Sequence, residues 1–178
     1  MLASATTELH LDSAVLVRAA QGGDRSAFGA LYEQYARMVH GILLAHVSYT
    51  EAEDLVQDVF VRAMQQLKAL REPGAFGGWL GAIARRAAMD AHRRRRPSVE
   101  MQDFAGGFRP DAEPFEILAT LQELPKAYRE TLILRLVEGM SGPEIAEQTG
   151  LTPESVRVNL CRGMKLLREA LGGTYKHE

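Results

Sequence analysis

Arginine residues gather in two separate stretches of this sequence, and their guanidinium groups are suited to binding phosphate. From Trp79 to Pro97, six arginines stand against a single acid, Asp90. From Pro153 to Arg168, three arginines and one lysine stand against Glu154 alone. Each Lys or Arg that neutralises a nucleic-acid phosphate releases condensed counterions. The net charge of -2 therefore hides two basic segments, and these predict nucleic-acid binding.

Residues of other reactive types show no catalytic or metal-binding arrangement. His40 and His46 lie six positions apart, so they do not share a helix face, and His92 lies among arginines. Cys161 is the only cysteine, which excludes an internal disulfide and a cysteine-rich metal site. No phosphate loop or nucleophile–base pair is present. We expect a protein that is not an enzyme and uses no cofactor or metal, and Cys161 is either a redox sensor or a small hydrophobic residue.

The sequence has no feature of a membrane or exported protein. It lacks a run of about 18 apolar residues, so no membrane insertion is expected. Its N-terminus carries Glu8 and Asp12 in place of the basic start and apolar stretch of a secretory signal. Together with the single cysteine, these features predict a cytoplasmic protein.

The spacing of apolar residues predicts an all-α fold, because they recur every three or four positions and almost never alternate. A short helix is expected over residues 13–21, and a long one over 25–46. The next helix is expected to reach residue 70 from a capping box of Thr50 and Glu53. Its apolar stripe is Leu55, Val59, Met64 and Leu67. The segment 73–78, with Pro73, Gly74, Gly77 and Gly78, then breaks the chain before a third long helix from Trp79 to Pro97.

A change of composition separates two predicted domains. Residues 98–116 carry five acids against Arg109 and include Gly106, Gly107 and Pro110. We therefore predict two small helical domains, residues 1–97 and 115–178, joined by a flexible acidic linker over 98–114. In the second domain, a short helix near 117–121 precedes one that starts at Pro125 and ends at Gly139.

Residues 144–160 have the spacing of a helix-turn-helix. Ser141 and Glu144 form a predicted capping box, Ala146 allows a close helix crossing, and Gly150 suits a left-handed turn. Thr152 is expected to cap the last helix. The expected shared core is Ile145, Leu151, Val156 and Leu160. The second helix of this motif enters the major groove, and its N-terminal residues reach the base edges. The predicted base-reading residues are therefore Ser155, Arg157, Val158 and Asn159. Farther along the helix, the residues predicted to contact phosphates are Arg162, Lys165 and Arg168. The alternative is an ordinary helix pair with an arginine-bearing surface.

Both domains resemble conserved domains of the extracytoplasmic-function (ECF) sigma factors of the sigma-70 family. The first resemblance rests on Ala27-Phe28 with Leu31-Tyr32 and Tyr35, on 52–60, and on Trp79-Leu80 with Ile83-Ala84-Arg85 and Asp90. The second rests on 121–124 with Pro125 and Arg129, on Glu144-Ile145-Ala146 and Gly150, and on Val156, Leu160, Arg162 and 166–168. The resemblance covers nearly the whole chain, and the motifs occur in the same order as in the family.

The resemblance implies a transcription initiation factor with three kinds of contact. Residues that would dock on the clamp helices of the largest subunit of core RNA polymerase are Asp54, Leu55, Gln57, Asp58 and Phe60. Residues that would bind and help to melt the minus-10 promoter element are Arg71, Phe76, Trp79, Arg85, Arg86, Arg93 and Arg94. The second domain would bind the minus-35 element through Ser155, Arg157, Val158, Asn159, Arg162 and Lys165, and would contact the flap of the second-largest subunit. An anti-sigma factor partner is also expected.

Some residues depart from the family pattern. Arg86 stands where relatives usually have Asn, and Val158 and Asn159 replace a more usual Ser and Arg. The predicted minus-10 loop is unusually rich in glycine, at Gly74, Gly77 and Gly78. The alternative function is a stand-alone helix-turn-helix regulator, which would bind duplex promoter DNA without polymerase.

Overall fold

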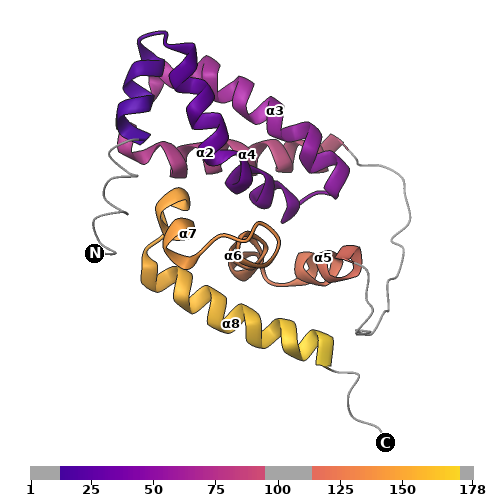
Figure 1. Ribbon diagram of the computed structural model, residues 1–178. Coiled ribbons are helices and arrows are strands. Elements are labelled where there is room, and N and C mark those ends of the chain that lie inside the picture. The colour runs from indigo at the N-terminus through magenta and orange to yellow at the C-terminus, as the bar shows by residue number, and fades with distance from the viewer. Residues whose placement is uncertain (1–12, 95–113, 173–178) are drawn as a thin grey trace, which may run out of the picture.

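The computed structural model describes residues 13–94 and 114–172, and every regular element in these two ranges is a helix (Figure 1). The all-α prediction is confirmed. Helices α2, α3 and α4 form one layer, and α5 to α8 form a second layer beneath it. We call residues 13–94 the N-terminal unit and residues 114–172 the C-terminal unit. The predicted linker, apart from Pro114, lies outside the described residues, as do Arg95 and Arg96.

The N-terminal unit contains a helical segment at 13–21 followed by three long helices, as the apolar spacing predicts. These are α2 (Arg25–Leu44), α3 (Tyr49–Gln66) and α4 (Phe76–Arg94). Asp24 caps α2, because its side chain accepts hydrogen bonds from the backbone N–H groups of Ser26 and Ala27. The three helices bury one continuous core that includes Leu31, Ile42 and Leu80, and each such side chain contributes about 1.5–3 kcal/mol by leaving water.

Three details of this unit differ from the prediction. The cap of α3 is Ser48, not Thr50, and its side chain makes no capping hydrogen bond. Met64 is exposed, because Ala63 takes the core position in that turn. The break between α3 and α4 comes earlier than predicted: α3 ends at Gln66 instead of residue 70, and α4 already begins at Phe76. Two short 3-10 turns, Leu67–Ala69 and Pro73–Ala75, lie between them.

The C-terminal unit contains the four helices expected from its sequence. They are α5 (Pro114–Glu123), α6 (Lys126–Leu136), α7 (Gly142–Thr149) and α8 (Pro153–Gly172). Pro125 is the residue before α6 and not its first residue. Helix α8 crosses α6 at Gly163, where a Cβ atom would lie 2.8 Å from Leu132 Cδ1. Helix α6 ends at Leu136 and is capped by Val137, three and two residues before the predicted end at Gly139, which has a left-handed backbone (φ 68°).

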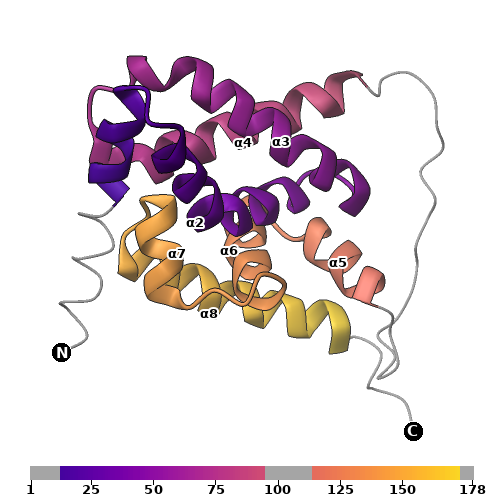
Figure 2. The same cartoon turned by 45° about the horizontal axis from the view of Figure 1, so that its top comes forward.

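The two units pack against each other, with α2 on α6 and α4 on α7 (Figure 2). Two glycines of the N-terminal unit allow this approach. A Cβ atom on Gly41 would lie 2.6 Å from Leu134 Cδ2, and one on Gly77 would lie 2.1 Å from the backbone oxygen of Gln148. Any other residue at Gly77 would overlap the C-terminal end of α7. No helix within the two described ranges is long and apolar enough to cross a bilayer.

Candidate nucleic-acid interface

Helices α7 and α8 are joined by the tight turn of a helix-turn-helix. Ser141 accepts a hydrogen bond from the Glu144 N–H, and the Glu144 carboxylate accepts one from the Ser141 N–H at 2.7 Å. This predicted capping box is confirmed. Gly150 is left-handed (φ 75°) and its N–H donates to Ala146 O, which ends α7 as expected. The Ser155 N–H donates to Thr152 Oγ1 at 3.1 Å, so Thr152 caps α8.

Three of the four predicted core residues of this motif pack into the core. Ile145 and Val156 are buried, and Leu160 is partly buried. Leu151 is exposed, because the turn places it at the rim of a groove between α7 and α8. This groove is lined mostly by apolar residues: Gly142, Pro143, Ala146, Glu147, Leu151, Pro153, Val156, Arg157 and Leu160.

Helix α8 carries the predicted minus-35 residues, some on its exposed side and some facing the rest of the protein. Arg157, Arg162 and Lys165 are exposed, and Lys165 lies 4.0 Å from Glu169. Ser155, Val158 and Asn159 are partly buried. The Asn159 side chain donates to Thr131 Oγ1 at 3.4 Å, so α6 holds it in one orientation. A basic, capped helix suits insertion into a major groove, whereas the Asn159 amide faces α6 in this arrangement.

Helix α4 and the turns before it carry the predicted minus-10 residues. Arg71, Arg86, Arg93 and Arg94 are exposed, and Arg94 also donates to the Asp90 backbone oxygen. Phe76 is almost completely buried, and its ring packs on Tyr35 and Trp79 at centroid distances of 5.1 and 5.8 Å. Trp79 is partly buried. The exposed arginines can reach phosphates, while Phe76 supports the start of the helix from inside.

The predicted polymerase-binding residues lie on α3 and fall into two groups. Asp54, Gln57 and Asp58 are exposed, whereas Leu55 and Phe60 are buried in the core. An apolar patch adjoins the exposed group and contains Phe28, Tyr32, Phe60, Val61 and Met64 together with Gln57. This surface combines negative charge with exposed apolar area, which suits a basic helical partner.

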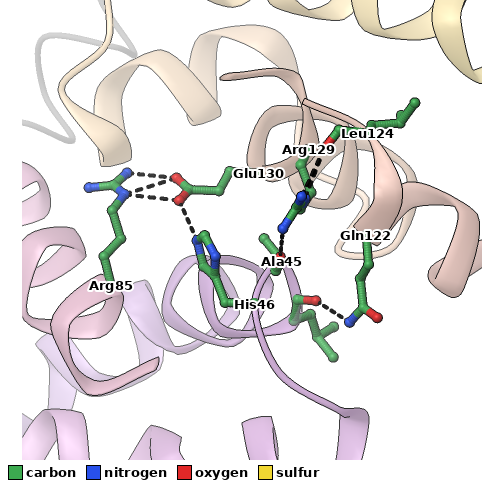
Figure 3. Close-up of polar contacts among 8 residues, drawn as sticks. Ala45, His46, Arg85, Gln122, Leu124, Arg129 and Glu130 are labelled. Carbon is green, nitrogen blue, oxygen red and sulfur yellow. Dashed lines mark hydrogen bonds and ion pairs between the residues drawn. The ribbon is translucent and has the colours of Figure 1, made fainter. Parts of the chain in front are cut away.

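Among the predicted minus-10 residues, Arg85 is held by a side chain of the C-terminal unit. Its guanidinium donates three hydrogen bonds of 2.8–3.0 Å to the carboxylate of Glu130, on α6 (Figure 3). His46 Nε2 contacts the same carboxylate at 2.9 Å. Burial raises the pKa of Glu130, but the hydrogen bonds and charges of His46 and Arg85 lower it by more, so the pKa lies below its ordinary value. The carboxylate is therefore ionised in this contact.

Other side chains of the C-terminal unit complete the end of α2. Arg129 donates to Ala45 O at 2.9 Å, and Gln122 donates to the carbonyl oxygens of Leu44 and Val47 at 2.7 and 2.8 Å. The last turn of α2 has no basic residue of its own. Side chains of the C-terminal unit therefore donate hydrogen bonds to carbonyl groups at this end of α2, and the positive charge of Arg129 lies near its partial negative charge.

Sequence reasoning missed this interface between the units. In the sequence, Glu130 has the features of an ordinary surface residue of a helix. The residues adjacent to it in sequence do not indicate that Arg85 is its partner. His40 and His46 were unassigned, and each contacts a glutamate of the C-terminal unit, Glu138 at 2.6 Å and Glu130 at 2.9 Å. The available signals were the glycines at positions 41 and 77. Within the described residues, no group of three or more His, Cys, Asp or Glu could hold a metal.

Comparison with known families accounts for both units. The model of sigma-70 region 2 matches residues 31–97, and the model of sigma-70 region 4 matches residues 115–167. The two sigma-70 regions are matched in the order of the N-terminal and C-terminal units. The chain belongs to the ECF group of the sigma-70 family of RNA polymerase sigma factors. The match across both units favours this assignment over a stand-alone helix-turn-helix regulator.

Individual sigma factors are similar to this chain over most of its length. The chain is 35% identical over 161 residues to RNA polymerase sigma factor CarQ of Myxococcus xanthus, covering 84% of this chain and 92% of that one. It is 29% identical over 181 residues to the ECF RNA polymerase sigma-E factor of Haemophilus influenzae, covering 90% and 96%. A longer relative from Xanthomonas campestris, a probable RNA polymerase sigma factor, is matched over only 42% of its length.

A solved structure shares the fold. It is that of CnrH in complex with the cytosolic domain of CnrY, with a TM-score of 0.63 and 25% identity. The similarity covers 92% of this chain and 99% of CnrH.

Proposed function

We propose that this chain directs core RNA polymerase to promoters by binding two DNA elements with its two units. The observation that carries the proposal is the presence of exposed arginines on two separate helices, α4 and α8. Helix α8 follows a helix-turn-helix turn and reads the minus-35 element as duplex in the major groove. Helix α4 and the preceding turns hold the minus-10 element as melted single strand. In this proposal a domain over residues 1–97 binds polymerase and the minus-10 element, and a domain over residues 115–178 binds the minus-35 element.

The polymerase contacts follow from the surface of α3. Asp54, Gln57 and Asp58 form an acidic and polar row beside the apolar patch of Tyr32, Val61 and Met64, and together they dock on the clamp helices of the largest subunit. Leu55 and Phe60 support this surface from the core. The C-terminal unit contacts the flap of the second-largest subunit. The chain supplies no catalytic group of its own, and it acts in the cytoplasm with the polymerase.

An inhibitory protein partner completes the proposal. CnrH, which shares this fold, was solved in complex with the cytosolic domain of another protein. The groove between α7 and α8, lined by Pro143, Leu151 and Leu160 among others, offers an apolar surface for such an anti-sigma factor. Co-purification from native cells that yields polymerase but never an inhibitor would count against this part.

Transcription in vitro tests the main proposal. Core polymerase is mixed with a library of randomised promoters in the presence or absence of the chain. We expect start-site-specific transcripts that require the chain, and enriched sequences at two positions near minus-10 and minus-35. Transcripts that do not depend on the chain would contradict the proposal, as would binding of the free chain to duplex promoter at the affinity of the holoenzyme.

A further inference from the structure

The side chain of Gln21 fixes the chain where it leaves α3 and turns toward α4. Its amide nitrogen Nε2 donates to Leu67 O at 2.9 Å and to Leu70 O at 2.8 Å. Both hydrogens of the amide group are therefore used on backbone oxygens. Leu67 O also accepts the Leu70 N–H at 3.1 Å, which closes the 3-10 turn Leu67–Ala69. Directly after this contact come residues 71–75, which we call the entry loop because they lead into α4.

The other end of the entry loop is connected to the same helical segment, 13–21, through Tyr35 of α2. Phe76 follows the loop directly, and its buried ring packs on the Tyr35 ring at a centroid distance of 5.1 Å. The Tyr35 hydroxyl donates to Ser13 Oγ at 3.1 Å. Ser13 and Gln21 lie at opposite ends of the segment. One short helical segment is thus linked to both ends of the entry loop.

The segment 13–21 is itself attached firmly to α2. Val17 is completely buried in the core of the N-terminal unit. The Gln34 side chain of α2 donates to Ser13 Oγ at 2.9 Å. Gly23 has a left-handed backbone (φ 100°), which allows the tight turn from the segment into α2. The segment therefore gives the entry loop a connection to the core that does not run through α3 or α4.

The entry loop has little burial of its own to hold its shape. Four of its five residues are exposed, including Arg71 and Gly74. One backbone hydrogen bond, from the Ala75 N–H to Glu72 O at 2.9 Å, closes its 3-10 turn. A loop that is ordered before binding loses less conformational freedom when it binds a ligand. The contacts at its two ends therefore influence how strongly it can hold a nucleotide strand.

Resting on the proposed function, we infer that the segment 13–21 is a brace for capture of the melted minus-10 strand. Gln21 and Ser13 are positioning residues, because they fix the two ends of the entry loop and bind no nucleotide themselves. Arg71, the first residue of the loop, is the predicted minus-10 residue nearest in sequence to the Gln21 contact. Loss of the brace should weaken and blur recognition of the minus-10 strand and leave the minus-35 contact intact.

Hydrogen exchange in the free full-length chain tests whether the brace exists. Gln21→Met keeps a side chain of similar length and removes both donors. Gln65→Met is the matched control, because Gln65 is an exposed glutamine of α3. We expect Gln21→Met alone to speed up amide exchange over residues 67–76, with no change in α6 to α8. Unchanged exchange over residues 67–76 would overturn the inference.

Strand binding by the reconstituted holoenzyme tests what the brace does. The probes are a single-stranded minus-10 oligonucleotide and a duplex minus-35 fragment, both taken from a promoter enriched in the transcription library. Gln21→Met should weaken binding of the single strand by about tenfold relative to Gln65→Met, because the loop must then be ordered on binding. The preference for the correct base in single-base variants of the oligonucleotide should fall as well. Affinities for core polymerase and for the minus-35 duplex should not change, and an equal loss on both DNA probes would overturn the inference.

Ser13→Ala provides a second variant at the other end of the brace. It removes the acceptor of the Tyr35 hydroxyl, and Ser26→Ala is its control at an exposed serine of α2. We expect Ser13→Ala to act in the same direction as Gln21→Met, both on exchange near Phe76 and on binding of the single strand. If Gln21→Met fails to fold, equal binding of the single strand by Ser13→Ala and Ser26→Ala overturns the inference.

Transcription distinguishes this inference from the proposed function. If the parent chain supports promoter-specific transcription and the two brace variants bind the single strand as tightly as their controls, the brace is wrong and the sigma function stands. If the parent chain supports no promoter-specific transcription, the proposed function itself fails, and the brace loses its role with it.

Discussion

Arg85 and Glu130 lie 45 residues apart in sequence, yet the guanidinium of one and the carboxylate of the other meet at 2.8–3.0 Å. The pair joins α4 to α6, and therefore the unit predicted to bind the minus-10 element to the unit predicted to bind the minus-35 element. A single contact thus connects the electrostatics of DNA binding to the relative position of the two units.

This contact should make stability depend on pH in the acid range. The pKa of Glu130 is lowered from its ordinary value of 4.5, so its contribution is fully present above pH 4.5 and is lost as the pH falls through the lowered value. At neutral pH, Glu130→Gln should reduce the free energy of unfolding by about 2 kcal/mol, because hydrogen bonds to charged groups are lost. Urea unfolding at a series of pH values measures both effects. The two chains should converge at low pH, and a constant difference would contradict the assignment, with Glu123→Gln as the control.

The capping box of α7 should contribute measurable stability. Ser141→Ala removes the acceptor for the Glu144 N–H and should cost about 1 kcal/mol in the free energy of unfolding. Ser26→Ala is the matched control, because Ser26 is an exposed serine in the first turn of α2 and its hydroxyl is not the cap of that helix. Equal stabilities of the two variants would show that the cap is not needed.

Glu144 should add an acid-sensitive part to the same cap. Hydrogen bonding to the Ser141 backbone, with a smaller effect of the Arg37 charge, lowers the pKa of its carboxyl. Glu144→Gln should therefore be less stable than the parent chain at neutral pH and should approach it as the pH falls below the ordinary value of 4.5. Thermal unfolding at several pH values measures this, and a difference that grows toward low pH would have the wrong sign.

Residues of α8 should differ in what they contribute to promoter binding by the holoenzyme. Arg162→Ala removes a predicted phosphate contact, so it should weaken binding to all sequences and reduce the slope of log K against log salt by about one. Asn159→Ala should mainly relax discrimination at one base pair, by about 1–3 kcal/mol. Competition binding with single-base variants of the minus-35 element separates the two effects. If Arg162→Ala changed the sequence preference and left the salt slope intact, the roles would be wrong.

The acidic row of α3 should determine binding to core polymerase. Asp58→Arg should weaken the complex by about tenfold or more, because it places a like charge against a basic helical partner. Glu123→Arg makes the same charge change on α5, and we expect no effect from it. Competition for core polymerase against a labelled parent chain gives both affinities. Equal loss in the two variants would indicate a non-specific charge effect in place of a docking site.

The sequence predicts the helices well and their mutual arrangement poorly. Apolar spacing identifies α2 and α3 to within a few residues, and the local signals at Ser141 and Gly150 predict the turn of the helix-turn-helix, because caps and left-handed glycines act within a few residues. Gly77 and Gly78 read as helix breakers, yet they lie in the first turn of α4, where the approach of α7 favours glycine. Glu130 gives no sign of its partner, since the pairing depends on the packing of distant helices.

Energy transfer between two dyes tests the whole account most directly when it is followed from the free chain to the promoter complex. The dyes are attached to cysteines that replace the exposed residues Thr50 and Ala170 in a Cys161→Ser chain. Addition of core polymerase and promoter should lengthen the distance in the same molecules that start specific transcripts, because the two units must reach elements on the order of 80 Å apart along the DNA. A compact distance that persists in a transcribing complex would contradict the claim that the two units separate to bind one promoter at two places.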